Sequence, residues 1–191
     1  MERSIPKCNK RRTGLGDKRV RQNRAKLREA FLELLAQHPF EEITVRQISD
    51  LSGVGYTTFF RHFPSKEGLL DVVITEEITR LTELGLPIYD NNDGPGACLA
   101  LCMYVDKHRP LWSALLMGGA APKVRDEMLK QSHNVTLTRE EHSSLPPNLS
   151  AALAVAVSLE LLSWWLIQPN PWPTERIAKI LHDYMILPGT M

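Results

Sequence analysis

The side chains between Thr44 and Lys66 have types and a spacing suited to binding a nucleic acid. This stretch, TVRQISDLSGVGYTTFFRHFPSK, combines hydroxyl groups, a cationic side chain near each end and several aromatic rings. Hydroxyl and cationic groups donate hydrogen bonds to phosphate oxygens, and an arginine can pair with the edge of a guanine. The chemistry predicted here is recognition of a polyanion, not the making or breaking of covalent bonds.

The segment that must position these groups is predicted to form two short helices joined by a tight turn. Thr44 can cap the first helix with Gln47 as its capping-box partner, and Gly53 suits a left-handed turn. The second helix covers Tyr56–His62 and is stopped by Pro64. Such a pair can place its second helix in the major groove, or it can be an ordinary helical hairpin. The residues predicted to anchor it in a core are Val45, Ile48, Leu51, Phe59 and Phe63.

The rest of the chain shows helical periodicity and no competing strand pattern, so the fold class predicted is all-α. A preceding helix runs from Lys18 to about Gln37, and Ser65 caps a helix that follows the pair. The segment Leu86–Gly96, rich in turn formers, is predicted to be a loop. The apolar face expected on the first helix consists of Val20, Leu27, Ala30, Phe31, Leu34 and Leu35. Further helices are expected near 95–108, 110–118, 122–141, 148–167 and 174–186.

The charge of the chain is divided unevenly along its length. Its formal net charge is +1, but residues 1–28 hold eleven lysines and arginines against Glu2 and Asp17, a local charge of +9. The remaining residues therefore carry −8. Residues 1–17 are predicted to be a flexible basic arm that attracts a polyanion, or else a solvated tail with no partner.

Composition narrows the classes of protein further. Three cysteines (Cys8, Cys98 and Cys102) argue against a disulfide framework and favour the cytoplasm. Ser158, Glu160 and Ser163 interrupt the longest apolar stretch, so no membrane span is expected. No nucleophile–base pair and no phosphate-binding glycine loop is evident, so no enzyme and no cofactor are predicted. Cys98 and Cys102, one helical turn apart, could be a redox pair or metal ligands, but buried thiols are favoured and no metal is predicted.

The stretch ITVRQISDLSGVGYTTFFRHFPSKEGLL resembles the DNA-binding domain of the TetR/AcrR family of transcriptional regulators. The resemblance covers about residues 20–75 and is carried by Thr-Val-Arg, the Gly-Val turn, a threonine before two large apolar residues, and Phe-Pro-Ser-Lys-Glu. It implies a three-helix DNA-binding domain over 18–64 and a larger helical domain over 65–191 for ligand binding and dimerisation. It also implies a homodimer, double-stranded operator DNA with a palindromic sequence, and a small-molecule inducer.

The resemblance also implies roles for individual residues. Thr44 and Lys66 match phosphate contacts, and Arg46 matches a residue that can reach a base. Phe60 stands where the family commonly has a tyrosine whose hydroxyl meets phosphate, and Tyr56 could contact a thymine methyl group. The complete set of predicted DNA contacts is Thr44, Arg46, Gln47, Gly55, Tyr56, Thr57, Thr58, Phe60, Arg61, His62 and Lys66.

The larger part offers candidates for an inducer pocket and for a dimer interface. Aromatic and soft side chains suit an adaptable apolar cavity or an ordinary core, and they are Met103, Tyr104, Trp112, Leu116, Met117, Trp164 and Trp165. Two apolar stripes could pair with a second copy as a four-helix bundle or belong to the monomer core. These stripes are Ala151, Val155, Leu159 and Leu162, with Ile177, Ile180, Leu181 and Tyr184. The sequence favours a homodimeric repressor released by an inducer, and the alternative is a regulator controlled by a protein partner.

Overall fold

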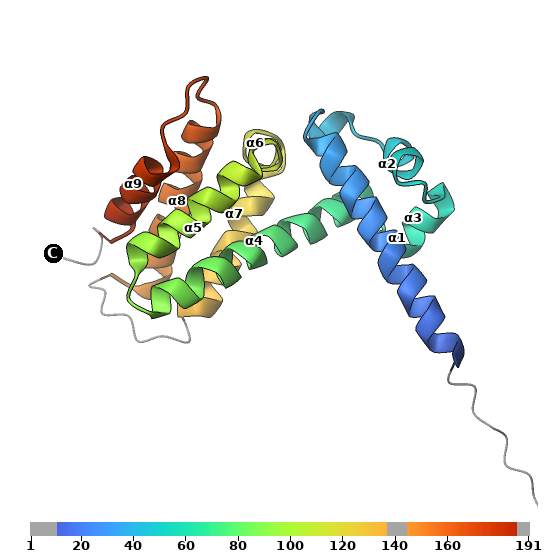
Figure 1. Ribbon diagram of the computed structural model, residues 1–191, viewed down its shortest axis with the longest axis horizontal. Helices are drawn as coiled ribbons and strands as arrows, with labels where there is room; N and C mark the ends of the chain where they lie inside the picture. The colour runs from blue at the N-terminus through green and yellow to red at the C-terminus, as the bar shows by residue number, and fades with distance from the viewer. Residues whose placement is uncertain (1–10, 137–144, 187–191) are drawn as a thin grey trace, which may run out of the picture.

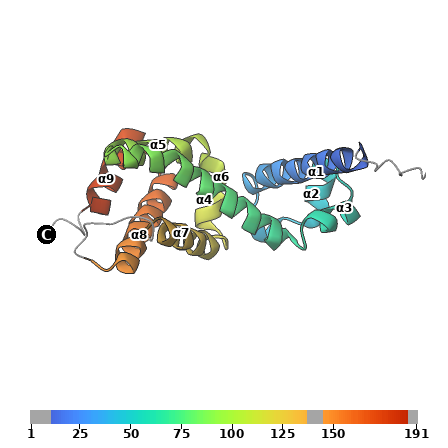
Figure 2. The same cartoon turned by 90° about the horizontal axis from the view of Figure 1, so that it is seen from below.

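The computed structural model describes residues 11–136 and 145–186, and every element within those ranges is a helix. Figure 1 shows α1–α3 at one end of an elongated molecule and α5–α9 at the other, with α4 running between them. Figure 2 confirms this division in a second view. The helices are α1 (Arg11–Leu35), a 3-10 turn η1 (Phe40–Glu42), α2 (Val45–Ser52), α3 (Tyr56–His62), α4 (Lys66–Asp90), α5 (Gly94–Lys107), α6 (Arg109–Met117), α7 (Ala121–Thr136), α8 (Pro147–Leu166) and α9 (Thr174–Ile186).

The turn between α2 and α3 has the predicted structure. Thr44 Oγ1 accepts a hydrogen bond from the Gln47 N–H at 3.2 Å, and Gln47 Oε1 accepts one from the Thr44 N–H at 2.8 Å. This capping box satisfies backbone donors that the first turn of a helix leaves without partners. Gly53 ends α2 in the left-handed region with φ 65°. Phe59 and Phe63 are buried, as predicted, so they fix the orientation of α3.

Two residues predicted to face the core are exposed instead. Leu51 is 47% exposed, and Val20 on α1 is also exposed. Val45, Ile48 and Leu51 do not share one face, because successive residues are rotated by about 100° and each step of three residues therefore moves the side chain further around the helix axis. The inward face of α2 follows i, i+3, i+4 and i+7, which places Ser49 and Ser52 on the core side and Leu51 outside.

The first helix begins earlier than predicted. It starts at Arg11, within the stretch expected to be a flexible arm, and not at Lys18. Gly14 and Gly16 each weaken a helix by about 1 kcal/mol, but they keep their N–H groups and do not interrupt the hydrogen bonding. The part of the predicted arm over 1–10 lies outside the described residues.

The predicted loop over Leu86–Gly96 is wrong at both ends, because α4 continues to Asp90 with Pro87 inside it and α5 already begins at Gly94. Pro87 lies in the last turn of α4, where it removes one hydrogen bond without interrupting a long helix. The helix ends in a turn in which Asn92 adopts φ 59°. Asp93 then caps α5 by accepting a hydrogen bond from the Gly96 N–H at 2.8 Å.

A buried carboxylate joins three helices near the middle of the molecule. The Glu77 side chain on α4 is 1% exposed and accepts hydrogen bonds from Arg28 of α1 at 2.5 Å and Arg80 at 3.0 Å. The Tyr104 hydroxyl on α5 donates to its other oxygen at 2.6 Å. Burial and this hydrogen bond to Glu77 raise the pKa of the Tyr104 phenol, so it remains a donor at neutral pH. Arg28 also pairs with Glu76 at 2.5 Å.

Replacing Glu77 by alanine is expected to lower the free energy of unfolding by about 2–4 kcal/mol, because three donors would lose their shared acceptor. Glu76→Ala is the matched control. It removes the more exposed partner of Arg28, and its expected cost is below about 1 kcal/mol. Urea unfolding followed by circular dichroism measures both. Equal losses for the two variants would contradict the central role of the buried carboxylate.

Candidate DNA-binding surface

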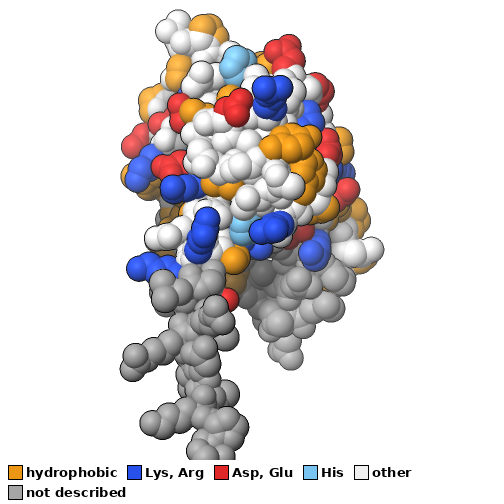
Figure 3. Space-filling view, turned by 90° about the vertical axis from the view of Figure 1, so that its right-hand side faces the viewer, with side chains coloured by type: hydrophobic (Ala, Val, Ile, Leu, Met, Phe, Trp, Pro, Cys, Tyr) orange, Lys and Arg blue, Asp and Glu red, His pale blue; other side chains and the backbone are white. Residues whose placement is uncertain are grey.

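The outer face of α3 carries several of the residues predicted to read DNA. Gly55, Tyr56, Thr57, Phe60 and Arg61 are exposed, while Thr58 and His62 are half-buried. Figure 3 looks onto this end of the molecule, where blue Lys and Arg and red Asp and Glu side chains are scattered around a largely uncharged centre with an apolar patch at one side. The helix therefore presents hydroxyl, aromatic and cationic groups to solvent on a support held by Phe59 and Phe63.

On α2, Arg46 extends from the first turn and is exposed, so its five donors are available to a ligand. Thr44 and Gln47 are exposed as well, but their polar groups are largely engaged with each other. The Thr44 hydroxyl donates to Gln47 Oε1 at 2.8 Å, the oxygen that also accepts the Thr44 N–H. Thr44 can donate its hydroxyl hydrogen bond to a phosphate only by giving up the bond to Gln47 Oε1, and the two capping-box bonds can remain.

Lys66, predicted as a phosphate contact, is engaged within the protein in this structure. Its ammonium group donates to three main-chain carbonyls, those of Phe40 at 3.0 Å, Glu41 at 3.1 Å and Ile43 at 2.8 Å. It also lies 4.6 Å from the centroid of the Phe40 ring. An ammonium group has three protons, and all three are used here. In this structure Lys66 is therefore a clamp between α4 and η1, and none of its three protons is left for a phosphate oxygen.

One cation that the sequence reasoning did not single out lies beside the end of α3. The Arg24 guanidinium of α1 is 5.1 Å from the centroid of the Phe63 ring. Burial, followed by the charge of Arg24, lowers the pKa of His62, so His62 is neutral at pH 7. The positive charge at this corner thus belongs to Arg24. Only the packing of α1 against α3 reveals this neighbour, because the two residues are far apart in sequence.

Arg28, another member of the basic N-terminal stretch, is not free to contact DNA. It is occupied by Glu76 and Glu77 within the protein. The side chains of Arg11 and Arg12 and the residues before them lie outside what the structure describes.

The predicted pocket residues are not all buried in the core of the larger helical part. Trp112, Leu116 and Trp165 are buried, and Tyr104 is half-buried against Glu77. Met103, Met117 and Trp164 are exposed, so they do not lie in the core with the buried members of the set. Aromatic and methionine content along a helix does not specify which face each side chain occupies.

Half of the residues in the predicted dimer stripes are buried within a single chain. The buried members are Val155, Leu162, Ile177 and Leu181. Tyr184 is exposed, and Ala151, Leu159 and Ile180 are half-buried. The exposed apolar residues of α8 and of its C-cap lie on another stripe at helical spacing, namely Leu149, Leu153, Trp164 and the C-cap residue Ile167. Because α8 is apolar on nearly every side, its periodicity could not distinguish the core face from the outer one.

The two cysteines of α5 are buried, as favoured by the sequence. Burial raises the pKa of the Cys98 thiol to about 11, and burial with the charges around it raises that of Cys102 to about 12. Both are thiols at neutral pH, a state that neither attacks disulfides nor binds metals readily. Within the described ranges, no group of three or more His, Cys, Asp or Glu side chains is placed to hold a metal ion.

A helix pair with a tight turn, an exposed second helix and adjacent arginines defines a helix-turn-helix protein. Residues 27–73 match the family model of bacterial regulatory proteins of the tetR family. The chain is 27% identical over 168 residues to the uncharacterized HTH-type transcriptional regulator YxbF of Bacillus subtilis (strain 168). That alignment covers 85% of this chain and 44% of YxbF, so the chain spans less than half the length of this relative.

Solved structures agree on the fold. A TetR transcriptional regulator from Streptococcus agalactiae superposes with a TM-score of 0.70 at 19% identity, covering 91% of this chain and 98% of the other. NalD, the secondary repressor of the MexAB-OprM multidrug efflux pump in Pseudomonas aeruginosa, gives 0.66 at 17% identity, covering 90% and 98%. The chain is therefore similar to TetR-family regulators in its helix-turn-helix sequence over residues 27–73 and in its overall fold. The matched family and these proteins are described as transcriptional regulators, the class of protein that the sequence predicted.

A substitution of Lys66 distinguishes a structural role of this side chain from a role in binding phosphate. Lys66→Met is expected to lower the free energy of unfolding by about 1–3 kcal/mol, because three carbonyls lose their donor. The slope of log affinity for DNA against log salt should stay unchanged. A phosphate-bound lysine would instead reduce that slope by about 1 when removed. Urea unfolding and fluorescence anisotropy at several salt concentrations measure the two quantities.

Proposed function

We propose that this protein is a DNA-binding transcriptional regulator that binds a palindromic operator as a homodimer and represses until a small molecule releases it. The observation that carries the DNA-binding part is the geometry of α2 and α3. The capping box fixes the start of α2, and the buried rings of Phe59 and Phe63 fix α3. The exposed groups of α3 and the free guanidinium of Arg46 are thereby held on the surface at one end of the molecule. Direct DNA contacts are proposed for the exposed residues among the DNA contacts predicted from the sequence. Arg24 is added to them, and Lys66 is left out.

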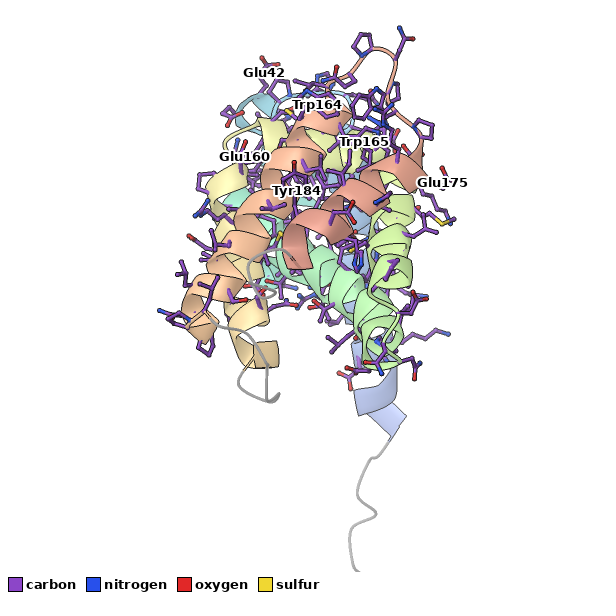
Figure 4. The ribbon with its side chains drawn as sticks, turned by 90° about the vertical axis from the view of Figure 1, so that its left-hand side faces the viewer. Glu42, Glu160, Trp164, Trp165, Glu175 and Tyr184 are labelled. Atoms are coloured by element: carbon purple, nitrogen blue, oxygen red, sulfur yellow. The ribbon has the colours of Figure 1, made fainter. Side chains whose placement is uncertain are left out.

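The homodimer is supported by the amount of apolar surface on α8. By length and composition alone α8 could cross a membrane, yet only 28% of its apolar window is buried in the chain. A helix of this kind needs another partner for its outer stripe. Figure 4 looks onto α8 and α9 and labels Glu160, Trp164 and Tyr184 at this end of the molecule. A second copy is the proposed occupant, because a two-fold dimer presents two copies of α3 to two half-sites of a palindrome.

The inducer part of the proposal rests on a buried polar group in the larger helical part. The Trp112 side chain is 1% exposed, and its Nε1–H has no hydrogen-bond partner among the described residues. A buried donor without an acceptor costs about 1–3 kcal/mol, which a ligand with an acceptor atom would offset. The alternative remains a regulator controlled by a protein partner. A thermal-shift screen of small apolar compounds separates the two, since only the first predicts stabilisation. The cytoplasm is the proposed location for a DNA-binding regulator of this family.

For the operator, Arg46→Ala is expected to weaken binding by about 1–3 kcal/mol and to relax the preference at one base position. The measurement is selection of the operator from random DNA with the full chain, followed by mobility-shift titration of both proteins. Asp50→Ala, an exposed change on the same helix, is the control for general effects. Unchanged affinity and selectivity in Arg46→Ala would remove this residue from the interface.

For the dimer, Leu153→Arg should convert the protein to a monomer, because it places a charge in the apolar stripe of α8. Size-exclusion chromatography with light scattering should then report about the chain mass of 21.6 kDa in place of twice that mass. Val20→Arg, which alters an exposed apolar residue of α1, should remain dimeric. A wild-type protein that is monomeric at all concentrations would refute the homodimer. A dimeric Leu153→Arg would place the interface elsewhere.

A further inference from the structure

Tyr56 and Phe60 form an apolar edge on the outer face of α3. Successive residues of a helix are turned by about 100°, so residues four apart lie almost above one another. Tyr56 and Phe60 therefore share one edge of the exposed face, while Thr57 and Arg61 occupy its middle. The two aromatic residues are 56% and 45% exposed. This is a large apolar area to leave in water on a helix of seven residues.

The two rings are held in place before any ligand binds. They meet edge to face with their centroids 5.2 Å apart. The Phe60 ring also meets the Phe59 ring edge to face at 5.3 Å, and Phe59 is fully buried with Phe63 packed on it at 5.8 Å. A continuous row of rings thus runs from the core of the DNA-binding end to its surface. Rings fixed in this way lose little conformational freedom on binding.

The chemistry of this edge restricts what it can recognise. Phe60 has no polar atom, so it cannot donate to a phosphate oxygen or to a polar base edge. In the major groove the apolar group on an unmodified base pair is the C5-methyl of thymine. The polar middle of the same face, formed by Thr57 and Arg61, is left to contact hydrogen-bonding groups on the DNA.

We propose that Tyr56 and Phe60 determine operator specificity as a preorganised aromatic pair that reads the C5-methyl groups of pyrimidines. This inference rests on the proposed function, because it requires α3 to enter the major groove. It assigns thymines to the half-site positions beneath this edge. A cytosine methylated at C5 presents the same methyl group, so it should partly replace thymine at those positions.

The test uses the full chain and its selected operator, with each thymine of a half-site replaced in turn by uracil. Uracil keeps the base pair and removes only the methyl group. At one or two positions the affinity should fall about fourfold, the effect expected for burying one methyl group. Phe60→Ala and Tyr56→Ala should each bind the thymine and uracil operators equally at the position that they read. Replacing thymine by cytosine should lower affinity at those positions, and C5-methylation of that cytosine should restore part of it.

Two further variants act as controls. Phe60→Tyr keeps the ring and should keep the sensitivity to uracil. Leu84→Ala removes an exposed apolar side chain from α4 and should also keep it. The uracil arm changes only the DNA, so it remains decisive even where an alanine variant folds poorly.

Two results would overturn the inference while leaving the proposed function intact. The first is unchanged affinity with uracil at every thymine of the half-site, together with selective binding to that operator. The second is a uracil effect that persists undiminished in both alanine variants. Failure of the wild-type protein to select any DNA sequence is a separate outcome, and it would overturn the proposed function itself.

Discussion

The buried carboxylate of Glu77 is the interaction on which the arrangement of the molecule depends. It lies on α4, accepts from Arg28 of α1 and Tyr104 of α5, and is almost fully removed from solvent. A buried charge is tolerated only while its partners remain in place. Moving α1 or α5 away from α4 would expose or strand that charge. The match to the tetR family model ends at residue 73, inside α4, so this helix belongs to both halves of the chain. The position of the DNA-binding end is therefore tied to the packing of the larger helical part.

A second connection lies closer to the helix-turn-helix. Lys66 holds η1 against the start of α4 through three carbonyls, and Glu41 of η1 accepts a hydrogen bond from the Gly119 N–H at 3.2 Å. Gly119 lies in the turn between α6 and α7, and a side chain there would collide with the Glu41 carboxylate. The larger helical part thus touches the segment that leads directly into α2. The orientation of α2 and α3 depends on this contact as well as on α4.

The sequence was most informative where a local rule had a single solution. The capping box of Thr44 and Gln47, the left-handed Gly53 and the buried Phe59 each follow from chemistry within a few residues. It was less informative where several arrangements satisfy the same pattern. On α8, apolar on nearly every side, periodicity could not separate Val155 in the core from Leu153 outside it. The sequence does not reveal whether the Lys66 ammonium donates to phosphate oxygens or to main-chain carbonyls, because only the folded structure brings the carbonyls of η1 close to Lys66. Arg24 beside Phe63 depends in the same way on the packing of distant segments.

The sparse charge of α3 is consistent with a DNA-binding surface on which electrostatic attraction and base selection come from different residues. Long-range attraction to DNA depends on the number of phosphates neutralised and falls with salt, whereas base selection depends on contacts at fixed positions. The basic residues are concentrated before α2, in and ahead of α1, while α3 carries Arg61 and a neutral His62. Salt should therefore act mainly through the N-terminal cations. Changes on α3 should act mainly through sequence preference. A recognition helix can be apolar at its edge and still be selective, because the electrostatic part of binding is supplied by other elements of the same domain.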